Sequence, residues 1–264
     1  MQEFKGDYPM KVRNINIEKF NKDKTKYYIL NKIIKGDNSL IYSDDKSYII
    51  GQSSPNLPIW IWHASNYDLE KLINDLDKLL VNDENKITCS QELYKKLQEK
   101  YKFKDYFEMG YLECSSLIKT QKKGIFVRPN YSDIVTLANY WIQNEKEIDN
   151  IDISMNDAIE EVNEWINSKN FYVLKDNKGK IVSIAGYSLM DDIAKITHVY
   201  TPKEERKKGY CKSLIYELTK KLLEDNYKVM LYTNYNYEPS NKAYIGVGFE
   251  NKGILINTKI IKQG

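Results

Sequence analysis

Residues His198–Lys212 read HVYTPKEERKKGYCK and carry the strongest structural signal in this chain. The β-branched and aromatic residues before Pro202 favour a strand, and the proline ends it because proline cannot donate to a hydrogen-bonded ladder. Basic residues then lead to Gly209, and the apolar spacing over residues 210–226 predicts an amphipathic helix. The stretch is therefore predicted to form a strand, a basic glycine-containing turn and a helix.

The turn between this strand and helix has the composition of an anion-binding site. The N–H groups in the first turn of a helix have no carbonyl partner within the helix, and the helix dipole adds positive potential there. Gly209 lets the backbone approach an anion closely, while Lys207, Lys208 and Lys212 supply positive charge. We therefore predict a phosphate-binding turn, with a solvated basic turn as the alternative.

The elements predicted around this stretch alternate between strands and helices, which is typical of an α/β fold with a mixed sheet. In the C-terminal half, strands are predicted over 125–128, 171–174, 181–189, 194–201, 229–233 and 250–261, and helices over 132–144, 154–168, 210–226 and 240–247. In the N-terminal half, strands are predicted over 40–42, 47–50, 58–64, 86–89 and 108–114, and helices over 15–20, 26–34, 68–80 and 91–101. The polar, glycine-ended stretch 121–124 predicts a boundary between domains 1–123 and 124–264.

Segments 58–114 and 194–261 share the order strand, helix, strand, helix, strand. This indicates either a degenerate internal repeat or a coincidence, since such alternation is common. The segments differ where the first strand meets the first helix. The first segment has only residues 65–66 there and no glycine, whereas the second has the basic connector 202–209. Only the second segment is therefore predicted to hold a phosphate.

A second motif follows the next predicted strand. Residues 238–249 read EPSNKAYIGVGF, and the predicted short helix carries the pattern SNxxYxxxGF. Together with the basic turn, in this order and at this spacing, the motif resembles the GNAT superfamily of N-acetyltransferases. The resemblance covers residues 125–264 and implies a GNAT-like acetyltransferase fold for the C-terminal domain. The smaller N-terminal α/β domain would then be a degenerate GNAT-like copy without the cofactor loop.

The resemblance implies an N-acetyltransferase that uses acetyl-CoA as cosubstrate and acetylates a primary amine of a small molecule or peptide by direct attack on the thioester. By the same resemblance, Val199, Tyr200 and Thr201 match the strand end whose backbone pairs with the pantetheine arm. Asn241 matches a residue that holds this arm, and Tyr244 matches the tyrosine that protonates the departing thiolate. A phenol with a pKa of about 10 suits an alkyl thiol with a pKa of about 8.5. The residues that match the pyrophosphate loop are Arg206, Lys207, Lys208, Gly209, Tyr210, Cys211 and Lys212.

The sequence departs from the family at two positions. Cys211 stands where the family has glycine or alanine; we interpret it as a packing residue, with a reactive thiol as the alternative because helix N-termini and lysines lower thiol pKa values. Lys195 stands near the place where some relatives carry a glutamate as general base. Asp191 and Asp192 are interpreted as turn residues. His198 is interpreted as a structural imidazole, with a base that takes the proton through water as the alternative. A chain of water molecules could also act in place of a general base, and an amine already deprotonated in solution would need none.

Two features are candidates for the acceptor site. The acidic connector 145–152 lies between the first two helices of the C-terminal domain and would suit a cationic amine, although acidic loops are commonly just solvated. Trp60, Trp62 and His63 on a predicted N-terminal strand could face the acceptor, but alternating aromatic residues favour a buried core.

The composition excludes other classes of protein. The 264 residues include 40 Lys and Arg against 37 Asp and Glu, so the net charge of +3 lacks the concentrated positive charge of a nucleic-acid-binding domain. Three cysteines without a CxxC spacing and two histidines indicate neither a disulfide framework nor a metal site. The longest apolar run, 57–62, is far shorter than the roughly 20 residues of a membrane helix, and the charged N-terminus is unlike a signal peptide. We expect a cytoplasmic monomer or homodimer without a membrane, metal or nucleic-acid partner.

A second hypothesis belongs to a different class: a non-catalytic acyl-CoA-binding or scaffold protein that kept the loop and lost turnover. The complete basic turn and Tyr244 favour the enzyme, whereas the missing general base favours the alternative.

Overall fold

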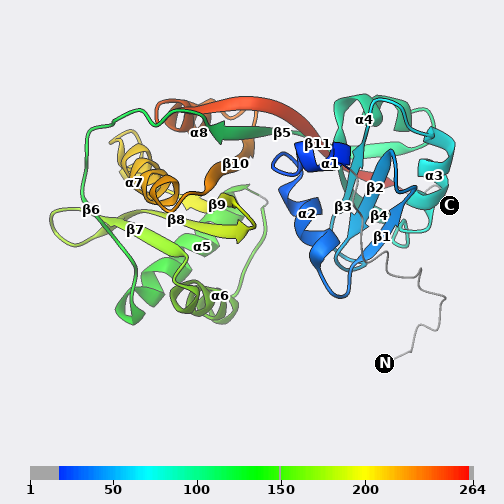
Figure 1. Ribbon diagram of the computed structural model, residues 1–264. Coiled ribbons are helices and arrows are strands. Elements are labelled where there is room, and N and C mark those ends of the chain that lie inside the picture. The colour runs from blue at the N-terminus through cyan, green and yellow to red at the C-terminus, as the bar shows by residue number, and fades with distance from the viewer. Residues whose placement is uncertain (1–17, 149, 262–264) are drawn as a thin grey trace. The chain divides into compact units, whose positions relative to one another are not determined.

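The chain divides into two compact units in the computed structural model, which describes residues 18–148 and 150–261 (Figure 1). Among these residues, unit 1 comprises 18–111, 234–236 and 252–261, and unit 2 comprises 112–233 and 237–251. Strands β5 (Lys102–Cys114) and β11 (Phe249–Ile261) contribute residues to both units. Compact packing does not by itself define an evolutionary domain, so the limit between residues 123 and 124 stays a prediction.

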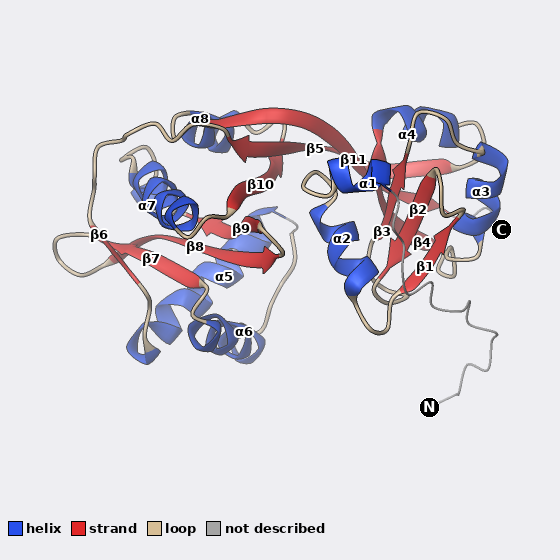
Figure 2. Ribbon diagram, viewed as in Figure 1, coloured by secondary structure: helices blue, strands red, loops and turns tan. Residues whose placement is uncertain are grey.

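Unit 2 is a mixed sheet with helices on both faces (Figure 2). Its other elements are β6 (Ile125–Val127), α5 (Ile134–Ile148), α6 (Met155–Ser168), β7 (Phe171–Lys175), β8 (Ile181–Met190), β9 (Ile193–Tyr200), α7 (Tyr210–Glu224), β10 (Lys228–Asn234) and α8 (Glu238–Ile245). The strands follow the order β10-β9-β8-β7-β6, in which β10 and β9 are parallel and the other neighbours antiparallel. This parallel pair with the α7 crossover between its strands positions the candidate site.

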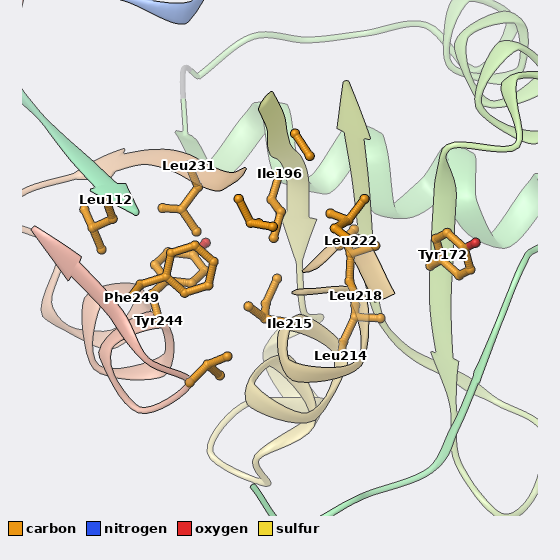
Figure 3. Close-up of a cluster of buried hydrophobic side chains, with 14 of the residues drawn as sticks. Leu112, Tyr172, Ile196, Leu214, Ile215, Leu218, Leu222, Leu231, Tyr244 and Phe249 are labelled. Carbon is orange, nitrogen blue, oxygen red and sulfur yellow. The ribbon is translucent and has the colours of Figure 1, made fainter. Parts of the chain in front are cut away.

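Two apolar cores cover the two faces of this sheet. The predicted stripe of α7, with Leu214, Ile215, Leu218 and Leu222 fully buried, forms one core together with the residues of β7 and β9 that face α7 (Figure 3). Helices α5 and α6 form the second core on the opposite face, where Trp165 stacks on Phe171 with ring centroids 4.4 Å apart. Side chains alternate along a strand, so one strand supplies both cores.

Unit 1 is also a mixed sheet covered by helices. Its elements are α1 (Glu18–Asp23), α2 (Tyr28–Lys35), β1 (Leu40–Ser43), β2 (Tyr48–Gln52), β3 (Ile59–His63), α3 (Leu69–Asp77), β4 (Glu84–Ser90) and α4 (Gln91–Leu97), besides its parts of β5 and β11. The order is β1-β2-β3-β4-β11-β5, with β3 and β4 parallel. Trp60 and Trp62 on β3 are 6% and 1% exposed, so the prediction that they belong to a buried core is confirmed.

The predicted order of elements is confirmed throughout the described residues, including the repeated order in β3-α3-β4-α4-β5 and β9-α7-β10-α8-β11. The first residues of the helix predicted over 15–20 lie outside the described residues, where α1 begins at Glu18. Three boundaries are wrong by several residues. Helix α4 ends at Leu97 and not at residue 101, and β5 begins at Lys102 and not at residue 108. Helix α5 continues to Ile148, so part of the acidic connector predicted over 145–152 is helix. None of the helices within 18–148 and 150–261 combines the length and apolar character that crossing a membrane requires.

Candidate active site

The strand predicted to end in the site, β9, contains a β-bulge. Tyr200 pairs with Ile184 of β8 and Thr197 pairs with Gly186, so three steps along β9 face two steps along β8. The extra residue distorts the strand at His198, whose φ of +52° lies in the left-handed region. Bulges change the direction of side chains, and this one directly precedes Val199–Thr201, the strand end that the resemblance matches to the pantetheine arm.

The bulge reverses which face the β9 side chains address. Ala194 and Ile196 belong to the core beneath α7, whereas Tyr200 belongs to the core beneath α5 and α6. His198 also lies on the α5 and α6 side, with its ring centroid 5.2 Å from that of Trp141 and 5.0 Å from that of Trp165. Burial lowers the pKa of His198 to about 4, so its imidazole is neutral at pH 7. This surrounding of aromatic rings fits the structural interpretation of His198.

Strands β9 and β10 pair over only part of their lengths. Their parallel register ends at the pair Ile196 and Leu231, while β9 continues to Tyr200 and β10 to Asn234. Beyond that pair, the β9 edge opposite β8 carries backbone groups that β10 does not match. An extended molecule with amide groups can bind such an edge as an added strand.

The predicted phosphate turn directly follows β9. A short 3₁₀ turn, Lys203–Glu205, leads to Gly209, which has a φ of +82° and precedes the first residue of α7 without any side-chain cap. The first bond of the helix ladder runs from the N–H of Ser213 to the carbonyl of Gly209, at 3.1 Å. The N–H groups of residues 210–212 therefore lie in the uncapped first turn, as an anion site requires. We call residues 206–212 the elbow.

The corresponding turn of unit 1 is built differently. Helix α3 follows β3, and the carboxylate of Asp68 caps it by accepting the N–H of Lys71 at 3.0 Å. A negative side chain thus already occupies the helix N-terminus, where it would repel a phosphate. This contrast agrees with the prediction that only the second copy can hold a phosphate.

Arg206, which the resemblance assigned to the elbow, directs its side chain elsewhere. Its Nη2 donates to a carboxylate oxygen of Glu147 at 2.6 Å, and its Nε donates to the carbonyl of Thr201 at 2.9 Å. The hydroxyl of Tyr200 donates to the same Glu147 side chain and to Gln143, both at 3.0 Å. The guanidinium therefore connects the end of β9 with α5. Only the backbone of Arg206, and not its side chain, is then directed to contribute to an anion site in the elbow.

The lysines of the elbow differ in their surroundings. Lys208 forms an ion pair with Glu205 at 2.9 Å, and its carbonyl accepts a hydrogen bond from Nζ of Lys123 at 2.7 Å. Lys212 lies against α8, because a Cβ at Gly246 would come within 2.8 Å of its Nζ. Lys123 is a residue that sequence reasoning missed, since it lies 85 positions before Lys208 in a stretch interpreted only as a boundary.

Tyr244 and Asn241 lie on α8, as predicted. Tyr244 is 6% exposed, and its ring packs within the α7 core at 6.2 Å from the ring of Phe249 (Figure 3). Its hydroxyl is hydrogen-bonded with Ser240 and interacts with Cys211 of the elbow. Burial raises the pKa of Tyr244, so the phenol stays protonated at neutral pH. Asn241 is partly buried one turn before it.

Cys211, within the elbow, packs against the α7 core. Burial raises the pKa of its thiol to about 11, although a hydrogen bond with Thr201 lowers it, so the neutral thiol prevails at pH 7. This supports packing and opposes the reactive alternative, because the thiolate is the nucleophilic form. The hydroxyl of Thr201 also lies 2.8 Å from that of Ser183 on β8, which ties the strand end to its neighbour.

The residues considered in place of the missing general base make structural contacts. Nζ of Lys195 lies 5.8 Å from the centre of the Tyr232 ring, a cation–π contact between β9 and β10. Asp191 and Asp192 form the turn between β8 and β9, as predicted. Glu161 on α6 is the carboxylate that interacts with His198, and it accepts a hydrogen bond from Nε1 of Trp165 at 2.8 Å.

Residues 136–249 match the family model described as the acetyltransferase (GNAT) family. This segment, which contains the bulge, the elbow and α8, is therefore a GNAT-family domain. A comparison with curated proteins finds no match.

Solved structures extend the fold similarity to most of the chain. An acetyltransferase of the GNAT family from Colwellia psychrerythraea has 10% identity, covers 90% of this chain and 97% of its own, and superposes with a TM-score of 0.58. A GCN5-related N-acetyltransferase from Kribbella flavida has 8% identity, coverage of 90% and 95%, and a TM-score of 0.60. A tandem GNAT protein from the clavulanic acid biosynthesis pathway has 7% identity, coverage of 86% and 85%, and a TM-score of 0.56. Such identities show the fold alone, and the tandem relative agrees with the repeat predicted for the N-terminal half.

Proposed function

We propose that this protein is an acetyl-CoA-dependent N-acetyltransferase that acetylates a primary amine of a small molecule or peptide. The observation that carries the proposal is the sequence of features along one strand and helix: β9 bulges at His198, leaves β10 after Ile196, and leads into the uncapped elbow at Gly209. A GNAT-family domain supplies the general reaction, acyl-CoA-dependent acetyl transfer.

The residues present fit acetyl-CoA. The elbow offers first-turn N–H groups and the positive charge of Lys207, Lys208 and Lys212, which suit a diphosphate. A Cβ at Gly209 would occupy the space beside the Lys123 side chain, so the glycine leaves this space open for a phosphate group. The β9 edge over Val199–Thr201 would pair with the amide groups of the pantetheine arm, and Asn241 would hold this arm from α8.

The proposed roles of the residues follow from their positions. Acetyl-CoA, when bound, supplies an acetyl thioester that a neutral amine attacks directly. An N–H of the strand end near Val199–Thr201 would donate to the thioester oxygen, where negative charge develops. Tyr244 keeps its proton at neutral pH and would donate it to the departing sulfur. The proton that the attacking nitrogen loses would pass to water, and a proton from water would restore the phenol. Most of the rate would come from holding amine and thioester together, because Lys195 cannot act as the carboxylate base of some relatives.

The proposal is tested first by binding and then by turnover. Calorimetric titration with acetyl-CoA should give saturable binding to the wild-type protein and none to Gly209→Glu, which places bulk and negative charge against the phosphates. The wild type should then release free thiol from acetyl-CoA in the presence of at least one member of a panel of small and peptide amines. Retained affinity in folded Gly209→Glu would contradict the assignment of the elbow.

A second function is supported by a specific observation, the burial of Tyr244 in the α7 core. A buried phenol that only packs would suit a non-catalytic acyl-CoA-binding or scaffold protein. Such a protein would bind acetyl-CoA but release no thiol with any amine, and Tyr244→Phe would change nothing. These results together would favour the non-catalytic binding protein over the enzyme.

A further inference from the structure

Lys123, in the stretch before β6, lies over the elbow. Its Nζ donates to the carbonyl of Lys208 at 2.7 Å. Its Nζ, Cε and Cδ would lie 3.4 to 3.5 Å from a Cβ at Gly209, so the length of the side chain runs along the face of that glycine. The ammonium group is therefore held beside the backbone of Lys208 and Gly209, the two residues that directly precede α7.

The backbone of Lys123 is fixed to the same helix turn. Its N–H donates to the hydroxyl of Ser213 at 2.9 Å, and this hydroxyl donates to the carbonyl of Lys123 at 3.2 Å. Ser213 is 1% exposed and donates its own N–H to Gly209, so one buried side chain ties the two segments together. Gly124 has a φ of +81°, and a Cβ there would come within 2.5 Å of the Lys175 carbonyl, so the chain must turn away directly after Lys123.

The current acceptor of the Lys123 ammonium is a neutral carbonyl. A phosphate oxygen is charged, and hydrogen bonds to charged acceptors are roughly twice as strong as neutral ones. Lys208 forms an ion pair with the carboxylate of Glu205, whereas Nζ of Lys123 donates to a backbone oxygen. A small rotation of a four-carbon side chain can therefore exchange the carbonyl for a phosphate at lower free energy.

We propose that Lys123 is a phosphate ligand of the elbow, which the segment before β6 contributes to bind the diphosphate of the coenzyme. This inference rests on the proposed function, since it assigns a further residue to the same coenzyme. Ser213 acts in it as a positioning residue, because its hydroxyl fixes the Lys123 backbone without reaching the ligand itself.

The test compares Lys123→Met with Lys122→Met, which removes the same charge from the exposed neighbouring position. Calorimetry would use CoA, dephospho-CoA, which lacks the 3′-phosphate but keeps the diphosphate, and pantetheine, which has no phosphate. Lys123→Met should weaken both nucleotides about tenfold, the loss of one charge-assisted hydrogen bond, and leave pantetheine unchanged. Lys122→Met should leave all three affinities within about twofold of the wild type.

The outcomes separate this inference from the proposed function. Wild-type protein that fails to bind CoA overturns both. Wild-type protein that binds CoA with the same affinity as Lys123→Met overturns only the assignment of Lys123. If Lys123→Met loses affinity for CoA but not for dephospho-CoA, Lys123 binds the 3′-phosphate, and its assignment to the diphosphate is wrong.

Ser213→Ala provides the check on positioning. Without the hydroxyl, the Lys123 backbone is released, so CoA affinity should fall in the wild-type background. The same change should have little further effect in Lys123→Met, because the ammonium is already gone. Equal losses in both backgrounds would mean that Ser213 acts on the elbow independently of Lys123, which contradicts the positioning role.

Discussion

A carboxylate oxygen of Glu147 lies 2.6 Å from Nη2 of Arg206, so the first residue of the elbow is bound to a helix 59 positions earlier in the chain. Burial alone would raise the pKa of Glu147, but hydrogen bonds from Arg206 and Tyr200 outweigh it and hold the pKa below its usual value. The cluster thus joins α5, the end of β9 and the start of the elbow through one ionised carboxylate.

Replacing Glu147 by Gln should lower the free energy of unfolding at pH 7 by about 1 kcal/mol, because both side chains of the ion pair are partly exposed. The folded-state pKa is lowered, so this stabilisation is present above the unfolded pKa of about 4.3 and is lost as pH falls through the folded value. Urea denaturation at pH 7 and at low pH measures the difference between wild type and variant, which should shrink at low pH. Glu160→Gln on the exposed surface of α6 is the control and should change little.

The cluster also illustrates what sequence reasoning can and cannot reach. The apolar spacing of α7 predicted its buried stripe, and the turn residues predicted where β9 ends and α7 begins, because these features are local. The partner of Arg206 is not local. The motif predicted a basic residue at that position, but only the folded chain brings Glu147 beside it.

The bulge in β9 is a second feature that the sequence did not reveal. The sequence predicted a strand over 194–201, and in an uninterrupted strand the alternation of side chains would place His198 on the same face as Ile196. The extra residue arises from the register with β8, and it turns His198 to the opposite face. Lys123 was missed for a similar reason: a polar stretch before a glycine reads as a linker until its contact with Ser213 is known.

Gly209→Ala should separate backbone strain from the approach of the ligand. A left-handed φ costs a non-glycine residue about 1 kcal/mol or more, so urea denaturation should show a loss of that size. The nearest atoms to the new methyl group would belong to the flexible side chain of Lys123. In the proposed complex the methyl group would also lie where the phosphate approaches, so calorimetry should show weaker CoA binding.

The matched control is Gly179→Ala, since Gly179 has a φ of +80° and open space around its Cβ position. It should lose similar stability and keep the wild-type affinity for CoA. Equal affinity in the two variants would mean that Gly209 serves the turn and not the ligand.

Tyr244→Phe should lower turnover by about 100-fold, the typical contribution of a general acid, while CoA affinity stays within about twofold. The measurement is thiol release with a responsive amine, combined with calorimetry. Tyr172→Phe is the control, because Tyr172 is buried in the same core and loses the same hydroxyl. If turnover and affinity fall together in Tyr244→Phe, the phenol holds the coenzyme or the core and does not donate the proton.

His198→Asn should change the pH dependence of stability. Burial lowers the folded-state pKa of His198 to about 4, whereas an unfolded histidine titrates at about 6.5. Between these values the unfolded chain takes up a proton that the folded chain does not, so the free energy of unfolding falls as pH decreases from about 6.5 towards 4, by about 3 kcal/mol in total. Glu161 and Lys195 are the charged neighbours, and their effects on His198 oppose each other.

Asparagine tolerates the left-handed φ of the bulge, so the variant should keep the β9 register while losing the titration. The lost ring contacts with Trp141 and Trp165 lower stability at every pH, which shifts the whole curve without tilting it. Urea denaturation from pH 4.5 to 7.5 therefore separates the two effects: lost packing shifts the free energy of unfolding equally at every pH, whereas lost protonation changes its slope with pH. His63→Asn is the control that retains the slope due to His198. Parallel curves for wild type and His198→Asn would show that the imidazole titrates alike in the folded and unfolded chain, and its aromatic surroundings would then not suppress its charge.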